Sequence, residues 1–337
     1  MIRYLGKRLV LTVILLIGIT LVTFTLTNLV PGDPVAAALG QRAADDPQIV
    51  ERFRQEFGLD KPLHEQYFSY LGRLIHGDLG MSWQTRRPVA QDLAGAIPAT
   101  MEIAFTAITM AVILGLVLGS IAAYRRGKIT DQVVRLISLL GISVPTFWTA
   151  ILFFYLFYYR LGIAPGSGRL SPGMPAPPRV TGMYTVDSVL AGDMRTFVDA
   201  AAHLALPSLV LTFFTVGLLT RFSRMALLEV LDKDFVRAAQ AKGLPARTVF
   251  VRYVLRAAAV PILTMVGLAF GSLLSGTVLV ESIFSWPGLG SYAYQSASKL
   301  DLLAVMGVGL FVGVVYLTIN LIIDIAYGFI DPRVKVG

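Results

Sequence analysis

Long runs without charged side chains dominate this chain and alternate with shorter polar segments. Six of these runs are long enough, or nearly so, to cross a hydrocarbon layer of about 30 Å as helices. They predict an all-α integral membrane protein with six transmembrane helices, at Leu9–Val30, Ile103–Tyr124, Leu136–Tyr159, Leu204–Thr220, Ala257–Val280 and Leu302–Ile323.

Three of the runs have features that modify their helices. The first follows basic residues, as the core of a signal peptide would. Its 22 residues exceed the roughly 7–15 of such a core, so we expect a permanent anchor. Pro145 should kink the third helix, because proline lacks the amide hydrogen that continues the helical ladder. The fourth run is the shortest and contains Pro207.

Apolar residues recur at helical spacing in the polar segment between the first two runs. One set precedes Gly58 and another precedes Gly77, and glycine commonly ends helices. The pattern predicts two short helices, on the outer face of the membrane or against the other spans. Their apolar positions are Ile49, Val50, Phe53 and Phe57 in the first and Leu63, Tyr67, Tyr70, Leu71 and Leu74 in the second. A self-packed cap and a docking surface both fit this pattern.

Small residues recur every fourth position in the second, fifth and sixth runs. Such stripes let helix backbones approach closely in lipid, where helix association depends on packing. We therefore expect helix packing at Gly115, Gly119, Gly267, Gly271, Gly309 and Gly313. The same stripes are also compatible with small sliding movements between helices.

The composition agrees with a membrane protein. The 337 residues are 55% hydrophobic and 15% charged, whereas soluble domains have about 45–50% apolar and about 25% charged residues. The absence of cysteine excludes disulfides and thiolate chemistry. His64, His76 and His203 lack the spacing of metal ligands, so no metal site is expected.

The basic residues follow membrane sidedness. With both termini cytoplasmic and Asp324 assigned to the membrane edge, the inner segments hold 17 of the 29 Lys and Arg but only five of the 21 Asp and Glu. This asymmetry agrees with the positive-inside rule. A nucleic-acid-binding surface would need one exposed basic face, so the net charge of +8 does not indicate nucleic acid as a partner.

The most distinctive polar segment, residues 232–261, lies between the fourth and fifth runs. Asp234 can cap a short helix over Phe235–Lys242, and Gly243 can end it in the left-handed conformation. Pro245 suits the first turn of a second helix. Eight residues make a rod of roughly 12 Å, short enough to fill a groove on a partner. Its small residues would let a docking protein approach the backbone closely.

This segment is similar to the EAA loop of bacterial ABC-importer permeases, which docks into a cleft of the ATP-hydrolysing subunit. FVRAAQAKGL and VLRAAAVP resemble the dipeptide/oligopeptide/nickel branch, as do VPGDP, FGLDKP, HGDLGMSW, VESIFSWPGLG and the tail IDPRVKVG. Arg237 replaces the glutamate that names the loop, and Ala257 replaces a common asparagine. The resemblance implies ATPase coupling through Asp234, Phe235, Arg237, Ala238, Ala239, Gln240, Ala241, Lys242, Gly243 and Leu244.

The resemblance also implies an architecture and partners. The expected fold is that of type I ABC-importer permeases, in the bacterial cytoplasmic membrane. Residues 1–96 would form the first transmembrane helix and an extracytoplasmic helical segment, 97–328 the permease core with its coupling loop at 226–256, and 329–337 a cytoplasmic tail. Expected partners are a second homologous permease in a heterodimer, one or two ATPase subunits and an extracytoplasmic substrate-binding protein. Di- and oligopeptides are the expected cargo, with nickel chelates and glutathione-like peptides as alternatives.

Ionisable residues at membrane depth are further candidates for function. Glu102 and Glu281 fall near the outer edge, where partly solvated structural roles are favoured. Alternatively, they line the translocation path or outer vestibule together with Phe284 and Trp286, and meet the amino terminus of a peptide. Asp324 near the inner edge is expected to pair with a cytoplasmic arginine.

No catalytic or nucleotide site is expected in this chain. Residues 127–130 lack the upstream glycine and adjacent hydroxyl of a phosphate-binding loop. The polar groups are too few to assemble a nucleophile, a base and an orienting residue. The subunit is therefore expected to be no enzyme and to hold no cofactor, with ATP and Mg²⁺ in the partner subunits. The competing class is a secondary transporter or channel, which would work without ATPase subunits.

Overall fold

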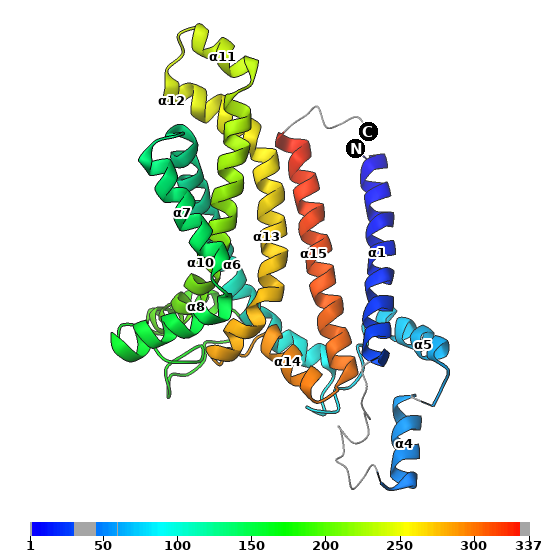
Figure 1. The fold of residues 1–337 in the computed structure, drawn as a ribbon. Coiled ribbons are helices and arrows are strands. Elements are labelled where there is room, and N and C mark those ends of the chain that lie inside the picture. The colour runs from blue at the N-terminus through cyan, green and yellow to red at the C-terminus, as the bar shows by residue number, and fades with distance from the viewer. Residues whose placement is uncertain (1, 30–44, 59, 331–337) are drawn as a thin grey trace. The chain divides into compact units, whose positions relative to one another are not determined.

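The computed structural model describes residues 2–29, 45–58 and 60–330, and in these ranges the regular structure is helical, without a β-strand (Figure 1). The chain divides into two compact units, which are described in turn. Unit 1 consists of residues 100–286 and the chain from Thr318 onward, and unit 2 of residues 2–99 and 287–317. The VPGDP motif and the tail after Ile330 lie outside the described residues.

Unit 1 is organised around one long helix, α10 (Met194–Leu231), which contacts α7, α8, α9, α13 and η2. Asp193 caps its start by accepting a hydrogen bond of 3.0 Å from the Thr196 amide. The other elements of unit 1 are the later part of α6 (Val89–Tyr124), α7 (Ile129–Ser143), α8 (Thr146–Phe153), the π-helix η1 (Phe154–Arg160), α9 (Tyr184–Leu190), α11 (Asp234–Ala241), α12 (Ala246–Thr248), the π-helix η2 (Val249–Leu255), α13 (Arg256–Ile283) and the end of α15 (Leu302–Ile330).

Glycine allows α10 to lie very close to α6 and α7. A Cβ on Gly115 would be 2.7 Å from the Leu219 Cβ, and one on Gly119 would be 2.8 Å from the Ser223 Cβ. The contact with α7 is closer still, because a Cβ on Gly217 would be 2.6 Å from the Ser138 carbonyl oxygen. Gly115 and Gly119 thus lie where α6 meets α10.

The other predicted packing glycines also lie at helix contacts or in the interior. A Cβ on Gly267 would overlap the Cδ1 of Ile323, so the Ile323 side chain on α15 would have to move. Gly271 is buried on α13. In unit 2, a Cβ on Gly309 would be 3.1 Å from the Thr23 Cγ2 and one on Gly313 would be 2.7 Å from the Ile19 Cδ1, so these side chains of α1 would have to shift.

The third predicted span is broken rather than kinked. Helix α7 ends at Ser143 and α8 begins at Thr146, and the two form an angle of 98°. Val144 adopts an extended conformation (φ −87°, ψ 126°), as expected of a residue that precedes proline. The single kinked helix predicted over Leu136–Tyr159 is therefore wrong, because the break involves both Val144 and Pro145.

Four helices are long and apolar enough to cross a membrane, and the broken α7–α8 pair would make a fifth candidate span. The apolar part of α1, Val10–Thr25, is shorter. The described residues thus provide four or five candidate spans where the sequence predicts six. The four long ones are Val89–Tyr124, Met194–Leu231, Ala246–Leu274 and Leu302–Tyr327.

Unit 2 contains α1 (Ile2–Leu29), the two predicted short helices and the ends of longer ones. The short helices are confirmed as α4 (Pro47–Phe57) and α5 (Leu63–Ile75). Gly58 ends α4 with φ 66°, in the left-handed region that favours glycine. Two apolar clusters hold the unit together. One joins α6, α14 (Leu289–Ser298) and α15 through Val89, Leu93, Ala96, Leu289, Ala304 and Val308. The other consists of Phe24, Tyr70 and Met306.

We predict that Gly217→Ala destabilises the protein while Gly95→Ala does not. The added methyl group at position 217 meets the Ser138 carbonyl oxygen and must push α7 away from α10. Overpacking of this kind costs about 1–3 kcal/mol. Gly95 lies on α6 with no atom within 4 Å of the added Cβ, so alanine there should be neutral or stabilising. Thermal unfolding of the full chain in detergent measures the stability of both variants. Equal melting temperatures would contradict the packing argument.

Candidate functional site

The predicted docking helix exists as α11, which lies beyond the end of α10 (Figure 1). Gly243 adopts φ 73° and its amide donates to the Gln240 carbonyl at 2.9 Å, which confirms the predicted helix end. The predicted capping by Asp234 is wrong. Lys233 occupies the cap position with extended backbone angles, and the Asp234 carboxylate lies instead 3.6 Å from the Arg237 guanidinium.

The inner face of α11 is part of a hydrophobic core at this end of unit 1. Val236 and Ala239 lie three residues apart, so they share one helix face, and both are buried. They pack in a cluster, the hinge core, whose other members come from the ends of α6, α10, η2 and α13. These members are Ala123, Leu227, Val230, Val249, Val254 and Ala258. The hinge core thus connects α11 to the ends of α10 and α13.

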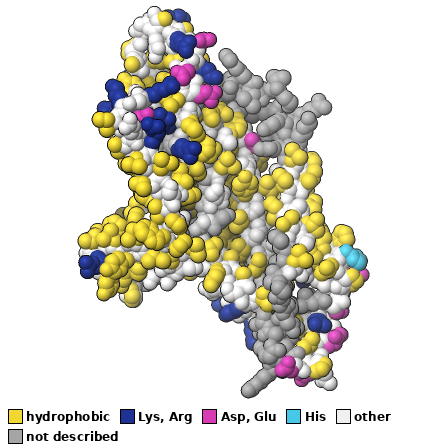
Figure 2. Space-filling view, in the orientation of Figure 1, with side chains coloured by type: hydrophobic (Ala, Val, Ile, Leu, Met, Phe, Trp, Pro, Cys, Tyr) yellow, Lys and Arg dark blue, Asp and Glu magenta, His cyan; other side chains and the backbone are white. Residues whose placement is uncertain are grey.

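The outer face of α11 remains available to a partner. Phe235 is 46% exposed, and small and polar residues surround it. Figure 2 shows Lys and Arg side chains gathered at this end of the unit. Two residues of the set predicted to couple to the ATPase are not exposed on this face. Ala239 is buried in the hinge core, and Leu244 packs partly against it. The exposed members of the predicted set are Asp234, Phe235, Arg237, Ala238, Gln240, Ala241, Lys242 and Gly243.

A buried ion pair links the start of α7 to α10 near the hinge core. The Asp131 carboxylate accepts two hydrogen bonds from Arg224, at 2.7 and 2.9 Å, and one from the Gly127 amide at 3.0 Å. Paired, two-bond contacts between arginine and a carboxylate are among the stronger polar interactions in proteins. In the sequence, both residues are distinguished only as charges of the segments expected to be cytoplasmic. Their partnership depends on the α7–α10 contact, which no local pattern specifies.

At the opposite end of unit 1, Glu102 and Arg169 form a second buried pair. Their closest oxygen and nitrogen lie 2.7 Å apart, and Glu102 also accepts from the Thr185 amide and hydroxyl. The Arg169 guanidinium donates to the Gly182 carbonyl and stacks 3.5 Å from the centre of the Tyr184 ring. This network attaches the loop after η1, together with α9, to α6.

The partly solvated environment predicted for Glu102 and Glu281 is wrong. Glu102 is 4% exposed and Glu281 is fully buried, where it accepts a hydrogen bond of 2.5 Å from Thr100. Protein donors replace the water that was expected around both carboxylates. Phe284 and Trp286 are buried as well, with the Arg169 guanidinium 5.6 Å from the Trp286 ring. The four residues predicted for an outer vestibule thus have buried side chains within this subunit.

A cavity of about 350 Å³ lies among α8, α10 and α13 in the apolar middle of unit 1. Its lining has no charged residue but includes three hydroxyl groups, from Thr146, Thr215 and Ser272. The break at Pro145 brings Thr146 to the cavity. The rest of the lining consists of Leu211, Phe214, Leu218, Ala269, Leu273 and Gly276.

Sequence reasoning missed this cavity because isolated hydroxyls inside apolar helices commonly bond to their own backbone. Thr215 does so, donating to the Leu211 carbonyl at 2.8 Å. The sequence feature that could have indicated the cavity is the position of Thr146 directly after Pro145, where the helix is interrupted. Among the residues that the structure describes, no group of His, Cys, Asp and Glu is arranged to hold a metal ion.

Asp187 organises the loop that supplies the Gly182 carbonyl to Arg169. It is buried and accepts hydrogen bonds from the Thr181 amide at 2.7 Å, the Gly182 amide at 2.8 Å and the Val180 amide at 3.3 Å. Burial by itself raises the pKa of Asp187, but these bonds and one from the Thr181 hydroxyl outweigh it. The pKa of Asp187 is therefore held below its ordinary value.

Two protein families match this chain. Residues 115–336 match the family described as binding-protein-dependent transport system inner membrane component. Residues 1–104 match the family described as the N-terminal part of such membrane components. Together the two matches span both units.

Curated relatives and a solved structure agree with these family matches. A probable D,D-dipeptide transport system permease protein of Escherichia coli K12 is 42% identical over 96% of this chain and 95% of its own length. A di/tripeptide transport system permease protein of Pseudomonas aeruginosa is 42% identical over 99% of each chain. A chain of the inward-facing MetNI methionine ABC transporter superposes with a TM-score of 0.50 and 16% identity, covering 69% of this chain and 94% of that one.

We predict that the loop around Asp187 loses stability in acid. Because the pKa of Asp187 is lower in the folded chain than when unfolded, its contribution is fully present above the unfolded value of about 4. The contribution declines as pH falls further, through the folded pKa. The protection of residues 180–187, meaning the factor by which their observed exchange is slower than the intrinsic rate at the same pH, should therefore be constant at neutral pH and decrease below about pH 4.

The matched variant is Asp187→Asn, whose amide cannot accept all four bonds. The variant should lose about 1–3 kcal/mol of local stability at neutral pH, so the amides of residues 180–187 should exchange faster. Their protection should also lose its acid dependence. Asp60→Asn, at an exposed position, serves as the control. Acid dependence that persists in Asp187→Asn would show that another group is responsible.

Proposed function

The chain belongs to the family of inner membrane components of binding-protein-dependent transport systems, and from this premise we propose that it imports di- and oligopeptides. In this proposal it forms half of the translocation path of an ATP-driven importer in the bacterial inner membrane. The names of its relatives support a peptide as the cargo. Among the alternatives, nickel chelates and glutathione-like peptides, the uncharged lining of the central cavity favours peptide amides as the common recognised feature.

The importer requires partners that provide the second half of the path, ATP hydrolysis and delivery of the peptide. A second, homologous permease completes the path as a heterodimer. ATPase subunits bind ATP and Mg²⁺ and dock on α11, and an extracytoplasmic binding protein delivers the peptide. The family description, which specifies binding-protein-dependent transport, supports the delivery step. The exposed Phe235 among small and charged residues supports the docking step.

We place both termini in the cytoplasm and count six spans. The six are the four long helices, the broken α7–α8 pair and α1. The excess of Lys and Arg in the segments that this topology puts inside supports the assignment. It makes the α11 end of unit 1 cytoplasmic and the Glu102 end extracytoplasmic.

One observation carries the mechanism: α11 shares the hinge core with α10 and α13, and these two helices line the central cavity. Closure of the ATPase dimer on ATP moves α11. Because Val236 and Ala239 are buried in the hinge core, α10 and α13 move with it. The cavity between them then changes the side of the membrane to which it opens.

A stand-alone secondary transporter is the competing class, and reconstitution separates the two. Vesicles that contain only this chain should not accumulate peptide. Vesicles that also contain the second permease, the ATPase subunits and the binding protein should do so when ATP is present. Uptake by the single chain without ATP would reject the proposal.

We predict that Gly243→Val uncouples transport from ATP hydrolysis. The left-handed backbone at position 243 costs a non-glycine residue about 1–2 kcal/mol, which corresponds to roughly a tenfold loss of the correctly shaped helix end. Peptide uptake per ATP should therefore fall by about tenfold, while membrane insertion is retained. No atom lies within 4 Å of the added Cβ, so steric clash in the core is not the cause.

Gly173→Val is the matched control for this experiment. Gly173 has φ 84° and equally open surroundings, but it lies in the loop after η1. It should bear the same backbone strain and keep the normal ratio of uptake to hydrolysis. A normal ratio in Gly243→Val would contradict docking at α11.

We further predict that Gly276→Leu obstructs the central cavity. Gly276 lines the cavity and has no atom within 4 Å of an added Cβ, so leucine can fill the space without breaking a helix contact. Peptide uptake should fall severalfold with little change in melting temperature. Gly95→Leu, which is open but lies outside the cavity, is the control. Undiminished uptake by Gly276→Leu would remove this cavity from the path.

A further inference from the structure

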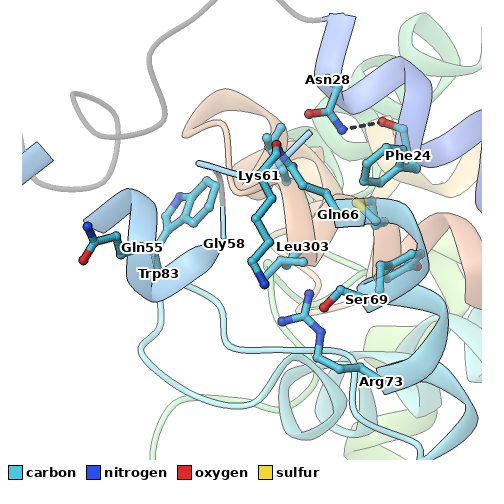
Figure 3. A pocket seen from close by; sticks show the side chains of 13 residues that line it. Phe24, Asn28, Gln55, Gly58, Lys61, Gln66, Ser69, Arg73, Trp83 and Leu303 are labelled. Carbon is cyan, nitrogen blue, oxygen red and sulfur yellow. Dashed lines mark hydrogen bonds between the residues drawn. The ribbon is translucent and has the colours of Figure 1, made fainter. Parts of the chain in front are cut away.

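Unit 2 contains a basic pocket that the transport mechanism does not use. Its volume is about 250 Å³, far more than the roughly 10–15 Å³ that a single water needs. Lys61 and Arg73 extend into the same space from either side of it, as Figure 3 shows. The outward end of α1 and the first turns of α15 complete the walls. The other lining residues are Phe24, Asn28, Gln55, Gly58, Gln66, Ser69, Tyr70, Trp83, Leu302, Leu303 and Met306.

The two cations of this basic pocket have no acidic partner in the described part of the chain. No ion pair there includes Lys61 or Arg73. The Arg73 Nε is buried without a hydrogen-bond acceptor. Two like charges that face one cavity repel each other, and an anion between them would turn this repulsion into attraction. The pocket is therefore electrostatically suited to an anionic group.

Tyr70 adds a buried donor to the basic pocket. It is only 2% exposed, and its hydroxyl has no hydrogen-bond partner. Burial, followed by the neighbouring Tyr67, raises the pKa of Tyr70 to about 12, so the hydroxyl keeps its proton at neutral pH. Buried hydroxyls are normally hydrogen-bonded. An oxyanion in the pocket would supply the missing acceptor after a small shift of the atoms that now cover the hydroxyl.

An apolar stripe on α1 leads to the pocket. Ile17, Leu21, Phe24 and Asn28 follow helical spacing and share one face, of which Phe24 and Asn28 line the pocket. Ile17 and Leu21 are about half exposed. At 1.5 Å per residue they lie about 16 and 10 Å before Asn28, so the stripe extends over about the depth of one leaflet of a hydrocarbon core about 30 Å thick. A ligand with an anionic head and an apolar tail therefore fits both features.

We propose that the basic pocket binds the phosphate of an anionic phospholipid, with Lys61, Tyr70 and Arg73 holding the headgroup and an acyl chain lying along the α1 stripe. Lys and Arg recognise phosphate through charge-assisted hydrogen bonds. Trp83 beside the pocket is typical of the interface between membrane and water. A soluble anion would use the cations and the hydroxyl but would leave the exposed stripe without a role.

Thermal unfolding of the full chain, purified in a non-ionic detergent, tests this assignment. Four probes are titrated: short-chain phosphatidylglycerol, short-chain phosphatidylcholine, inorganic phosphate and the dipeptide Ala-Ala. Phosphatidylglycerol should raise the melting temperature saturably and at lower concentration than the other three. An equal effect of inorganic phosphate would make the pocket a soluble-anion site, and an equal effect of Ala-Ala would make it a carboxylate site. Either result, or no preference for phosphatidylglycerol, would overturn the proposal.

Variants test whether the effect belongs to this pocket. Lys61→Gln and Arg73→Gln should each weaken phosphatidylglycerol binding by about tenfold, since each removes a charge-assisted bond. Arg54→Gln removes the same charge from an exposed position on α4 outside the pocket and should bind normally. Tyr70→Phe keeps the ring that packs against Phe24. Without lipid, Tyr70→Phe should melt at the same temperature as the unmodified chain, but it should bind phosphatidylglycerol more weakly. Unchanged affinity for phosphatidylglycerol in all three pocket variants would refute the proposal.

Discussion

The close approach of helix backbones around α10 is the constraint on which unit 1 depends. Inside a bilayer, lipid tails are as apolar as leucine, so helices associate through contact rather than through escape from water. Gly115, Gly119 and Gly217 remove the side chains that would hold α6 and α7 away from α10. The backbones of α6 and α7 therefore meet α10 directly at these positions.

Two buried ion pairs secure this helix assembly near its two ends. Asp131 and Arg224 join α7 to α10 near the hinge core, and Glu102 and Arg169 join α6 to the loop before α9. Each pair has additional hydrogen bonds, which offset the cost of removing the charges from water. The central cavity lies between the two ends and has no charged residue in its lining. The buried ion pairs and the uncharged cavity thus occupy separate parts of the unit.

The corrections to the sequence analysis share a physical origin. Glu102 lies near the edge of an apolar run, so its position along the chain indicated contact with water. Its actual partner, Arg169, comes from a loop 67 residues later, and Thr185 satisfies the other carboxylate oxygen. Asp234 has the side chain of a helix cap, but Lys233 takes that position and Arg237 attracts the carboxylate. In each case a specific partner changed the environment that residue type alone suggested.

The sequence by itself determined the features that depend on neighbours along the chain. These include the helical class of the protein, the short helices α4, α5 and α11 and the left-handed glycine at position 243. Period, caps and side-chain size act over one or two turns, so a linear pattern contains them. Only the tertiary structure decided which distant groups meet: Asp131 with Arg224, Thr146 with Ser272 at one cavity, and Lys61 with Arg73 at another. Such meetings depend on how whole helices pack, and packing is a property of the folded chain rather than of any segment.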